Sequence, residues 1–176
     1  SQRAKITDYD PYAVKYFKKH TGTTEAQEPF KRNIFLENIF FVTMTEYEKK
    51  LPVTVAFPPQ SIAMPIARVI SESHLKQLHM AETEKERFVT YYFNGQKEEP
   101  FAGEDRLIVP SAKVPTYDLK PEMSAHELTE VLIKKIQENI YDFIIINLAN
   151  PDMVAHTGVI PAAITACQVT DACVGK

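Results

Sequence analysis

An acid and an imidazole follow directly after the most apolar stretch of the chain. Asp152 and His156 come just after residues 143–148, Phe-Ile-Ile-Ile-Asn-Leu, and after the Asn150-Pro151 pair that ends the run. Such a β-branched, apolar run is typical of a strand covered on both faces in a parallel sheet. Ligands bind outside the carboxyl ends of such strands, and a separation of four residues puts both side chains on one face of a helix. A carboxylate beside a neutral imidazole suits a divalent metal such as zinc or manganese.

A simpler arrangement of the same residues is a helix start. Asp152 would then cap the helix and His156 would pack in its first turn, which is the commoner role for an isolated Asp and His. The local spacing leaves both interpretations open, because two ligands do not complete a metal site.

Lys85 is a second candidate for chemistry. It stands at the expected start of a helix among Glu82, Glu84 and Glu86, where it would either bind a phosphate over the strand ends or balance the three acids at the surface. From the local sequence alone we favour the surface lysine.

The remaining candidates carry weaker signals. Arg3 could bind a phosphate or carboxylate bidentately, although an arginine near a terminus is usually solvated. The other histidines lack acidic or cysteine partners at ligand spacing, so surface or packing roles are expected for His20, His74, His79 and His126. The sequence contains no Gly-rich phosphate loop, nucleophile elbow or paired-cysteine zinc pattern.

Hydrophobic periodicity predicts an α/β fold with a parallel sheet, because strands and helices alternate along the chain. We expect Thr83 to cap a helix that runs to Asn94-Gly95, and Ser124 with Glu127 to form a capping box. The charged run 96–106 is expected to be a solvated turn. In the last helix, one face should carry Ile160, Ala163, Ile164 and Cys167. The expected strands cover 39–45, 53–57, 77–81, 107–109 and 143–148, and further helices are expected over 8–20, 61–73 and from 125.

Composition excludes several classes of function. With 176 residues, 44% hydrophobic and 24% charged, the chain has the makeup of a globular protein with a real core. A net charge of -3 with both signs interspersed does not favour nucleic-acid binding, so a small-molecule partner is expected. No apolar run approaches membrane-spanning length. Cys167 and Cys173 are spaced for different helix faces, which favours reduced thiols and a cytoplasmic protein.

Eight separate strings occur in a characteristic order between residues 39 and 176. These are FVTMTEY (41–47), AETEK (81–85), FNG (93–95), EEPF (98–101), GEDR (103–106), TYDL (116–119), PEMS (121–124) and NPDMV (150–154). Together they resemble the cofactor-independent phosphoglycerate mutases, with a weaker match at residues 3–7. Agreement of eight unrelated strings is far more specific than any one motif.

The resemblance implies a fold and an activity. The family interconverts 3-phosphoglycerate and 2-phosphoglycerate through a phosphoserine, with two manganese ions in an alkaline-phosphatase-like domain and a second domain that holds the substrate. By position, Asp152 and His156 would bind manganese, Lys85 would contact the transferred phosphate as a catalytic and substrate-binding residue, and Arg3 would hold the substrate. Residues 1–57 would be the last piece of the substrate-holding domain, 58–60 (Pro-Pro-Gln) a hinge linker, and 61–176 part of the metal-binding domain.

The chain also departs from the family pattern. The nucleophilic serine segment and the later Asp-His pair and histidine have no counterpart in these residues, so we expect an internal fragment that is inactive alone and that can self-associate through exposed core surface. Ala155 replaces the family's glycine before the histidine, which matters only where positive φ or close backbone approach is needed. Two other classes stay open: another alkaline-phosphatase-like phosphomutase or phosphatase, and a non-catalytic binding domain.

Overall fold

The computed structural model describes residues 39–48 and 51–176, and the chain divides into two compact units, Ser1–Ser61 and Ile62–Lys176. Arg3, His20 and the helix predicted over 8–20 lie outside the described residues. The assignment of the two units to substrate and metal domains, with a hinge at 58–60, stays a prediction.

The described part of the first unit contains two short strands. β1 (Val42–Thr43) pairs in parallel with β2 (Thr54–Val55), with Val42 opposite Thr54. Both strands lie inside the predicted ranges but are shorter than expected. The last backbone hydrogen bond between these segments runs from the Phe57 amide to the Met44 carbonyl. Pro58 and Pro59 follow, and they have no N–H with which to continue the pairing.

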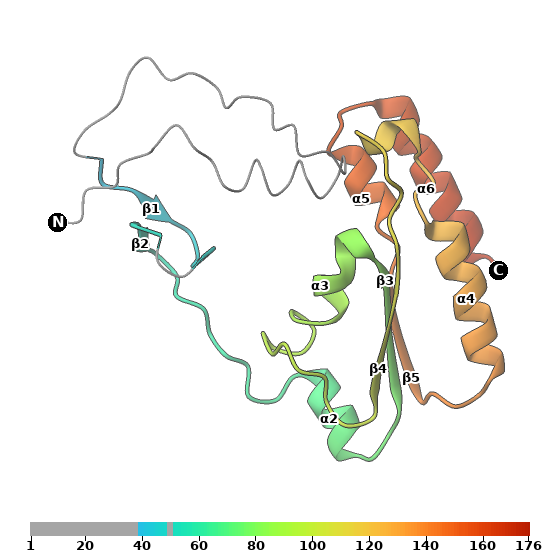
Figure 1. Ribbon diagram of the computed structural model, residues 1–176, viewed down its shortest axis with the longest axis horizontal. Coiled ribbons are helices and arrows are strands. Elements are labelled where there is room, and N and C mark those ends of the chain that lie inside the picture. Colours follow the sequence, from blue (N-terminus) through green and yellow to red (C-terminus); the bar gives the residue numbers. More distant parts are fainter. Residues whose placement is uncertain (1–38, 49–50) are drawn as a thin grey trace. The chain divides into compact units, whose positions relative to one another are not determined.

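The second unit is built on a three-stranded parallel sheet. Its strands are β3 (Gln77–Glu82), β4 (Glu104–Val109) and β5 (Phe143–Asn147), in the order β4-β3-β5. The central strand is buried at every position. This arrangement confirms the predicted α/β class, and it gathers the carboxyl ends of all three strands at one edge of the sheet (Figure 1).

Helices cover both faces of this sheet (Figure 1). α2 and α3 lie on one face and α4 on the other, while α6 packs on α4 and α5. The bounds are α2 (Ile66–Glu72), the 3-10 turn η1 (Thr83–Lys85), α3 (Glu86–Val89), the 3-10 turn η2 (Tyr117–Leu119), α4 (Ala125–Gln137), α5 (Asn150–Ala155) and α6 (Ile160–Val174).

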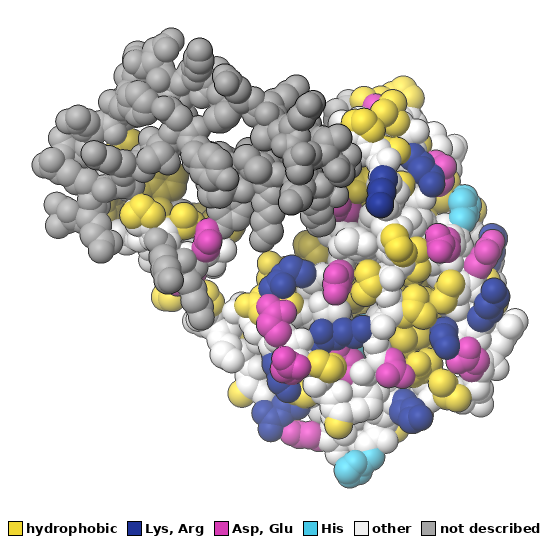
Figure 2. Space-filling view, viewed as in Figure 1, with side chains coloured by type: hydrophobic (Ala, Val, Ile, Leu, Met, Phe, Trp, Pro, Cys, Tyr) yellow, Lys and Arg dark blue, Asp and Glu magenta, His cyan; other side chains and the backbone are white. Residues whose placement is uncertain are grey.

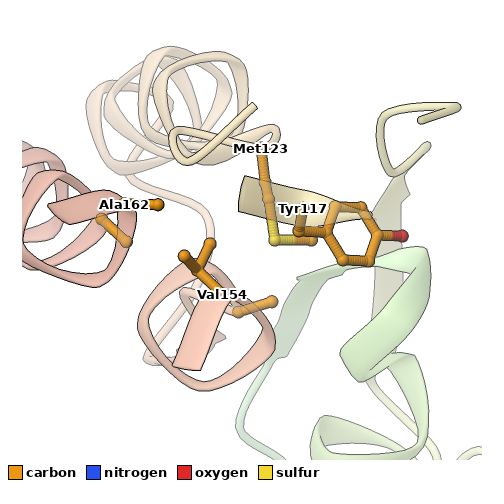
Figure 3. Close-up of a cluster of buried hydrophobic side chains, with 6 residues drawn as sticks. Tyr117, Met123, Val154 and Ala162 are labelled. Atoms are coloured by element: carbon orange, nitrogen blue, oxygen red, sulfur yellow. The ribbon is translucent and has the colours of Figure 1, made fainter. Parts of the chain in front are cut away.

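Two apolar clusters hold the layers together. Between the sheet and α4, the buried members are Leu78, Met80, Val109 and Leu128. Where α5, α6 and η2 meet, the buried members are Tyr117, Met123, Ala149, Val154, Ala162 and Ala166 (Figure 3). The second cluster fixes α5 at the carboxyl edge of the sheet, which is the edge where chemistry was expected.

The charged run before β4 is not simply a solvated turn, which corrects the sequence-based expectation. β4 begins at Glu104, three residues earlier than predicted, and Glu104 is buried. Its carboxylate accepts hydrogen bonds from Asn94 Nδ2 (2.7 Å), the Phe101 amide (2.9 Å) and Arg106 Nε (2.6 Å). These partners compensate the cost of burying the charge, so a run that looks solvated by composition enters the sheet.

Two local expectations about helix starts were also wrong. Thr83 begins a 3-10 turn and not a continuous helix to residue 94, and Ser124 makes no side-chain cap because its hydroxyl donates to the Pro110 carbonyl at 2.8 Å. The last helix is present as α6, in which the buried residues are Ala162, Ala166 and Cys173, while Ile160 and Ile164 on the expected shared face are exposed. Small residues point inward because α6 packs closely against α5.

β5 is only partly covered. All five of its residues have intermediate exposure, although the sequence suggested a strand buried on both faces. In the described sheet β5 is an edge strand, so its outer side lacks a neighbouring strand.

Candidate active site

The candidate residues reach the carboxyl edge of the sheet on two adjacent strands. β3 leads directly into η1, which ends at Lys85, and β5 leads after two residues into α5, which carries Asp152. Because β3 and β5 are neighbours, side chains separated by 67 positions meet at this edge.

Lys85 pairs with Asp152. The Lys85 ammonium donates to Asp152 Oδ2 and also lies 4.4 Å from the centre of the Phe88 ring. The lysine side chain is only 12% exposed, whereas that of Asp152 is 55% exposed. The preference for a surface lysine balancing neighbouring acids was therefore wrong, since its partner comes from a distant helix.

The ion pair sets the protonation of the acid. The hydrogen bond from Lys85 lowers the pKa of Asp152 below its ordinary value, outweighing the opposing effect of burial, and His156 adds a smaller lowering. Asp152 is therefore a carboxylate across the physiological range, the form that binds a metal ion.

His156 completes a carboxylate and imidazole pair. It follows α5 directly as its C-terminal cap, and its Nε2 lies 3.7 Å from Asp152 Oδ1. Bonds of about 2.0–2.2 Å to one metal ion allow two donors to lie up to about 4.2 Å apart, so this pair fits one ion. The N-cap of α5 is Ala149, so Asp152 is not the cap. Among the described residues, no group of three or more His, Cys, Asp or Glu side chains could hold a metal.

Ala155 fits without strain. It is the last residue of α5 and is not among the described residues with positive φ. The family glycine is therefore not required here for backbone freedom.

Several residues at this edge had no individual signal in the sequence. Glu82 ends β3 fully buried, and burial raises its pKa despite the nearby Ser111 and Ser124. Ser111 and Tyr117 bind the turn that carries Lys85. Tyr117 lies within one of the family strings, but neither its type nor its spacing pointed to this contact.

Two histidines have partners that the sequence spacing did not reveal. His79 is fully buried, with Nδ1 3.5 Å from Glu104 Oε1 and Nε2 3.0 Å from Gln77 Oε1, and His126 Nδ1 lies 3.8 Å from Cys173 Sγ. Both cysteines are free thiols. His79 lies near the amino end of β3 and so belongs to the scaffold.

Comparison with known families places this arrangement in a class of metal-dependent enzymes. Residues 18–176 match the metalloenzyme superfamily, and the chain belongs to it. Membership implies a metal cofactor, in agreement with the carboxylate and imidazole pair at the sheet edge.

Within this superfamily, the chain is similar to individual phosphoglycerate mutases. The chain is 54% identical over 154 residues to the 2,3-bisphosphoglycerate-independent phosphoglycerate mutase of Chloroflexus aggregans, covering 88% of this chain and 28% of the relative. It is 53% identical over 148 residues to the same-named protein of Clostridium novyi, covering 84% and 29%. The chain thus spans less than a third of these relatives.

A solved structure shows the same fold. Phosphoglycerate mutase from Leishmania mexicana, crystallised at low cobalt concentration, superimposes with a TM-score of 0.67 at 30% identity, over 76% of this chain and 25% of that one. No helix among the described residues has the length and apolar character to cross a bilayer. On the visible face of the second unit, acidic and basic side chains alternate without a patch of one sign (Figure 2).

Proposed function

We propose that the whole protein to which this chain belongs interconverts 3-phosphoglycerate and 2-phosphoglycerate through a phosphoserine intermediate, as a cytoplasmic enzyme of glycolysis and gluconeogenesis. The observation that carries the proposal is the convergence of Lys85, Asp152 and His156 at one sheet edge. Identity of 54% to a phosphoglycerate mutase supports this choice within the superfamily.

Each residue has a distinct role in this proposal. Asp152 and His156 would hold one of two manganese ions, which when bound supply positive charge that lowers the pKa of a hydroxyl nucleophile and neutralises phosphoryl oxygens. Lys85 donates hydrogen bonds to the phosphoryl group, where a fixed ammonium stabilises the charge that develops during transfer. Arg3 binds the substrate bidentately.

Position also matters for Lys85. The Phe88 ring and the surrounding chain keep its ammonium largely out of water, so its attraction for an anion exceeds that of an exposed lysine. In the free chain Asp152 neutralises this ammonium. A bound phosphate would compete with Asp152 for the same charge.

In this proposal the two units act as separate domains. The first would hold the substrate and the second the metal, and rotation about 58–60 would bring the substrate to the metal edge. The 176-residue chain alone is expected to be inactive, because the family's serine segment and later metal ligands have no counterpart in it.

The test compares the chain with the whole gene product. With manganese and 3-phosphoglycerate, the whole product should form 2-phosphoglycerate and its Lys85→Met variant should lose at least about a hundredfold in kcat, the scale of removing one transition-state donor. A matched control is Lys135→Met, which removes a half-buried lysine of α4 paired with Glu138 at 2.9 Å. Hydrolysis of phosphate esters without isomerisation would indicate a related phosphatase, and no turnover would indicate a binding domain; either result overturns the proposal.

Metal binding gives an independent measurement. A chain with two ligands of one site should bind manganese weakly, and Asp152→Asn should weaken it further. Tight stoichiometric binding would show that further ligands exist in the chain.

A further inference from the structure

The turn that carries Lys85 is held by hydrogen bonds from the loop after β4. The Ser111 hydroxyl accepts from the Glu84 amide at 3.2 Å, and the Ser111 amide donates to Thr83 Oγ1 at 3.3 Å. Thr83 Oγ1 also lies 3.4 Å from the Val109 carbonyl, to which it donates. Two residues of the three-residue turn η1 are therefore tied to β4 and the residues that follow it.

Tyr117 adds a link from a different direction. Its hydroxyl donates to Glu84 Oε1 at 3.0 Å, so it holds the residue immediately before Lys85. Its ring is 7% exposed and belongs to the apolar cluster that includes Ala149 and Val154 (Figure 3). Val154 belongs to α5 and Ala149 caps it, so the ring packs against the helix that carries Asp152.

Tyr117 thus contacts both the turn that carries Lys85 and the helix that carries Asp152. A lysine has a long, flexible side chain, and its ammonium is placed accurately only when its backbone is fixed. The side-chain bonds to Thr83 and Glu84 restrict that backbone, while the ring of Tyr117 sets the distance to α5.

We propose that Ser111 and Tyr117 are positioning residues for Lys85, holding its turn in register with the helix that carries Asp152. The inference rests on the proposed function for the meaning of the Lys85 site. The contacts themselves, however, are properties of this chain and are measurable without turnover.

The experiment uses the 176-residue chain with nitrogen-15 in lysine side chains and backbone amides. Tyr117→Phe keeps the ring and removes only the hydroxyl; Ser111→Ala removes the acceptor for the Glu84 amide, and Ser111→Thr keeps a hydroxyl. We expect the Lys85 ammonium order parameter to fall below about 0.6 in Tyr117→Phe and Ser111→Ala. Exchange of the Glu84 amide in Ser111→Ala should accelerate roughly tenfold, the effect of one lost hydrogen bond. Ser111→Thr should restore both signals.

Tyr141→Phe is the matched control. The Tyr141 hydroxyl donates to Asp105 Oδ2 at 2.8 Å, which is also a tyrosine and carboxylate bond, but it lies at the amino end of the sheet. This control should leave the Lys85 signals unchanged. If Tyr117→Phe and Ser111→Ala likewise leave them unchanged, or if Tyr141→Phe alters them equally, the positioning role is overturned.

Folding and function are separated by design. Ser111→Thr is a second variant at this position in case Ser111→Ala does not fold. If Lys85 is more disordered in Ser111→Ala and Ser111→Thr fails to restore its order, the proposal is contradicted. Failure of the whole gene product to isomerise phosphoglycerate would refute the proposed function but would leave these signals as expected.

Discussion

At the scale of single residues, the pairing of Lys85 with Asp152 is the contact that gives the sheet edge its chemistry. The local sequence singled out Asp152 as a possible metal ligand but favoured a surface role for Lys85, which lies among three acids. Their meeting depends on β3 and β5 being neighbours, which only the topology establishes. Residue types therefore indicated the kind of chemistry, and the fold decided which side chains share it.

Lys85→Met tests this pair directly. Because the hydrogen bond from Lys85 is the largest cause of the lowered pKa of Asp152, the variant should raise that pKa toward its ordinary value. The carboxyl carbon signal of Asp152, followed against pH by NMR, measures the change. Lys135→Met should leave it unmoved, and an unshifted Asp152 pKa in Lys85→Met would contradict the ion pair.

Glu104 illustrates how much a buried charge depends on its partners. Glu104→Ala removes the acceptor for Asn94, the Phe101 amide and Arg106, and should lower the free energy of unfolding by about 3–5 kcal/mol. Glu98→Ala is the matched control, since its 66% exposed side chain pairs with Arg87 at the surface, and it should cost less than about 1 kcal/mol. Urea unfolding at neutral pH measures both, and similar costs would refute the buried network.

His79 makes the stability depend on pH. Burial is the largest cause that lowers its pKa below 6.5, partly opposed by Glu104, while Arg106 lowers it further. Below pH 6.5 His79 becomes protonated in the unfolded chain while it stays neutral in the folded chain. The free energy of unfolding therefore falls as the pH drops below 6.5, and this site adds no pH dependence above that range. His79→Gln should reduce this slope, as measured by thermal unfolding from pH 5 to 8, and an unchanged slope would contradict the prediction.

At the scale of elements, the sequence predicted whether a segment is a helix or a strand better than it predicted where that segment begins and ends. β3, α4 and β5 follow from clear periodicity, and all three occur close to their expected positions. The start of β4 was not predicted because its charged residues give no strand signal, although Asn94, Phe101 and Arg106 satisfy the buried Glu104. The inward face of α6 was not predicted because alanines, not isoleucines, fit against α5. Patterns in a single sequence carry hydrophobicity but not the shape of the neighbouring element.

Gly103 occupies a turn in which a residue with a side chain would be strained. It has φ of +78° immediately before β4, and a Cβ there would lie 2.9 Å from the Leu75 carbonyl oxygen. Gly103→Ala should therefore lower the free energy of unfolding by more than about 1 kcal/mol. Gly175→Ala, whose Cβ would have no atom nearer than 3.5 Å, should change it by about 0.5 kcal/mol or less, as measured by urea unfolding. Equal effects would contradict the crowding at Gly103.

At the scale of the whole molecule, the second unit exposes surface that resembles core. Among the described residues β5 is an edge strand with intermediate burial along its length, and α6 presents Ile160 and Ile164 at 68% and 54% exposure. An uncovered apolar helix face and an unpaired strand edge both favour association between copies. We therefore expect the chain to self-associate as its concentration rises.

Sedimentation velocity over a range of concentrations measures this self-association, and Ile160→Lys with Ile164→Lys should shift the equilibrium toward monomer. The matched double variant Thr165→Lys with Gln168→Lys adds the same charge to α6 without removing apolar surface, so an equal shift would show that charge alone is responsible.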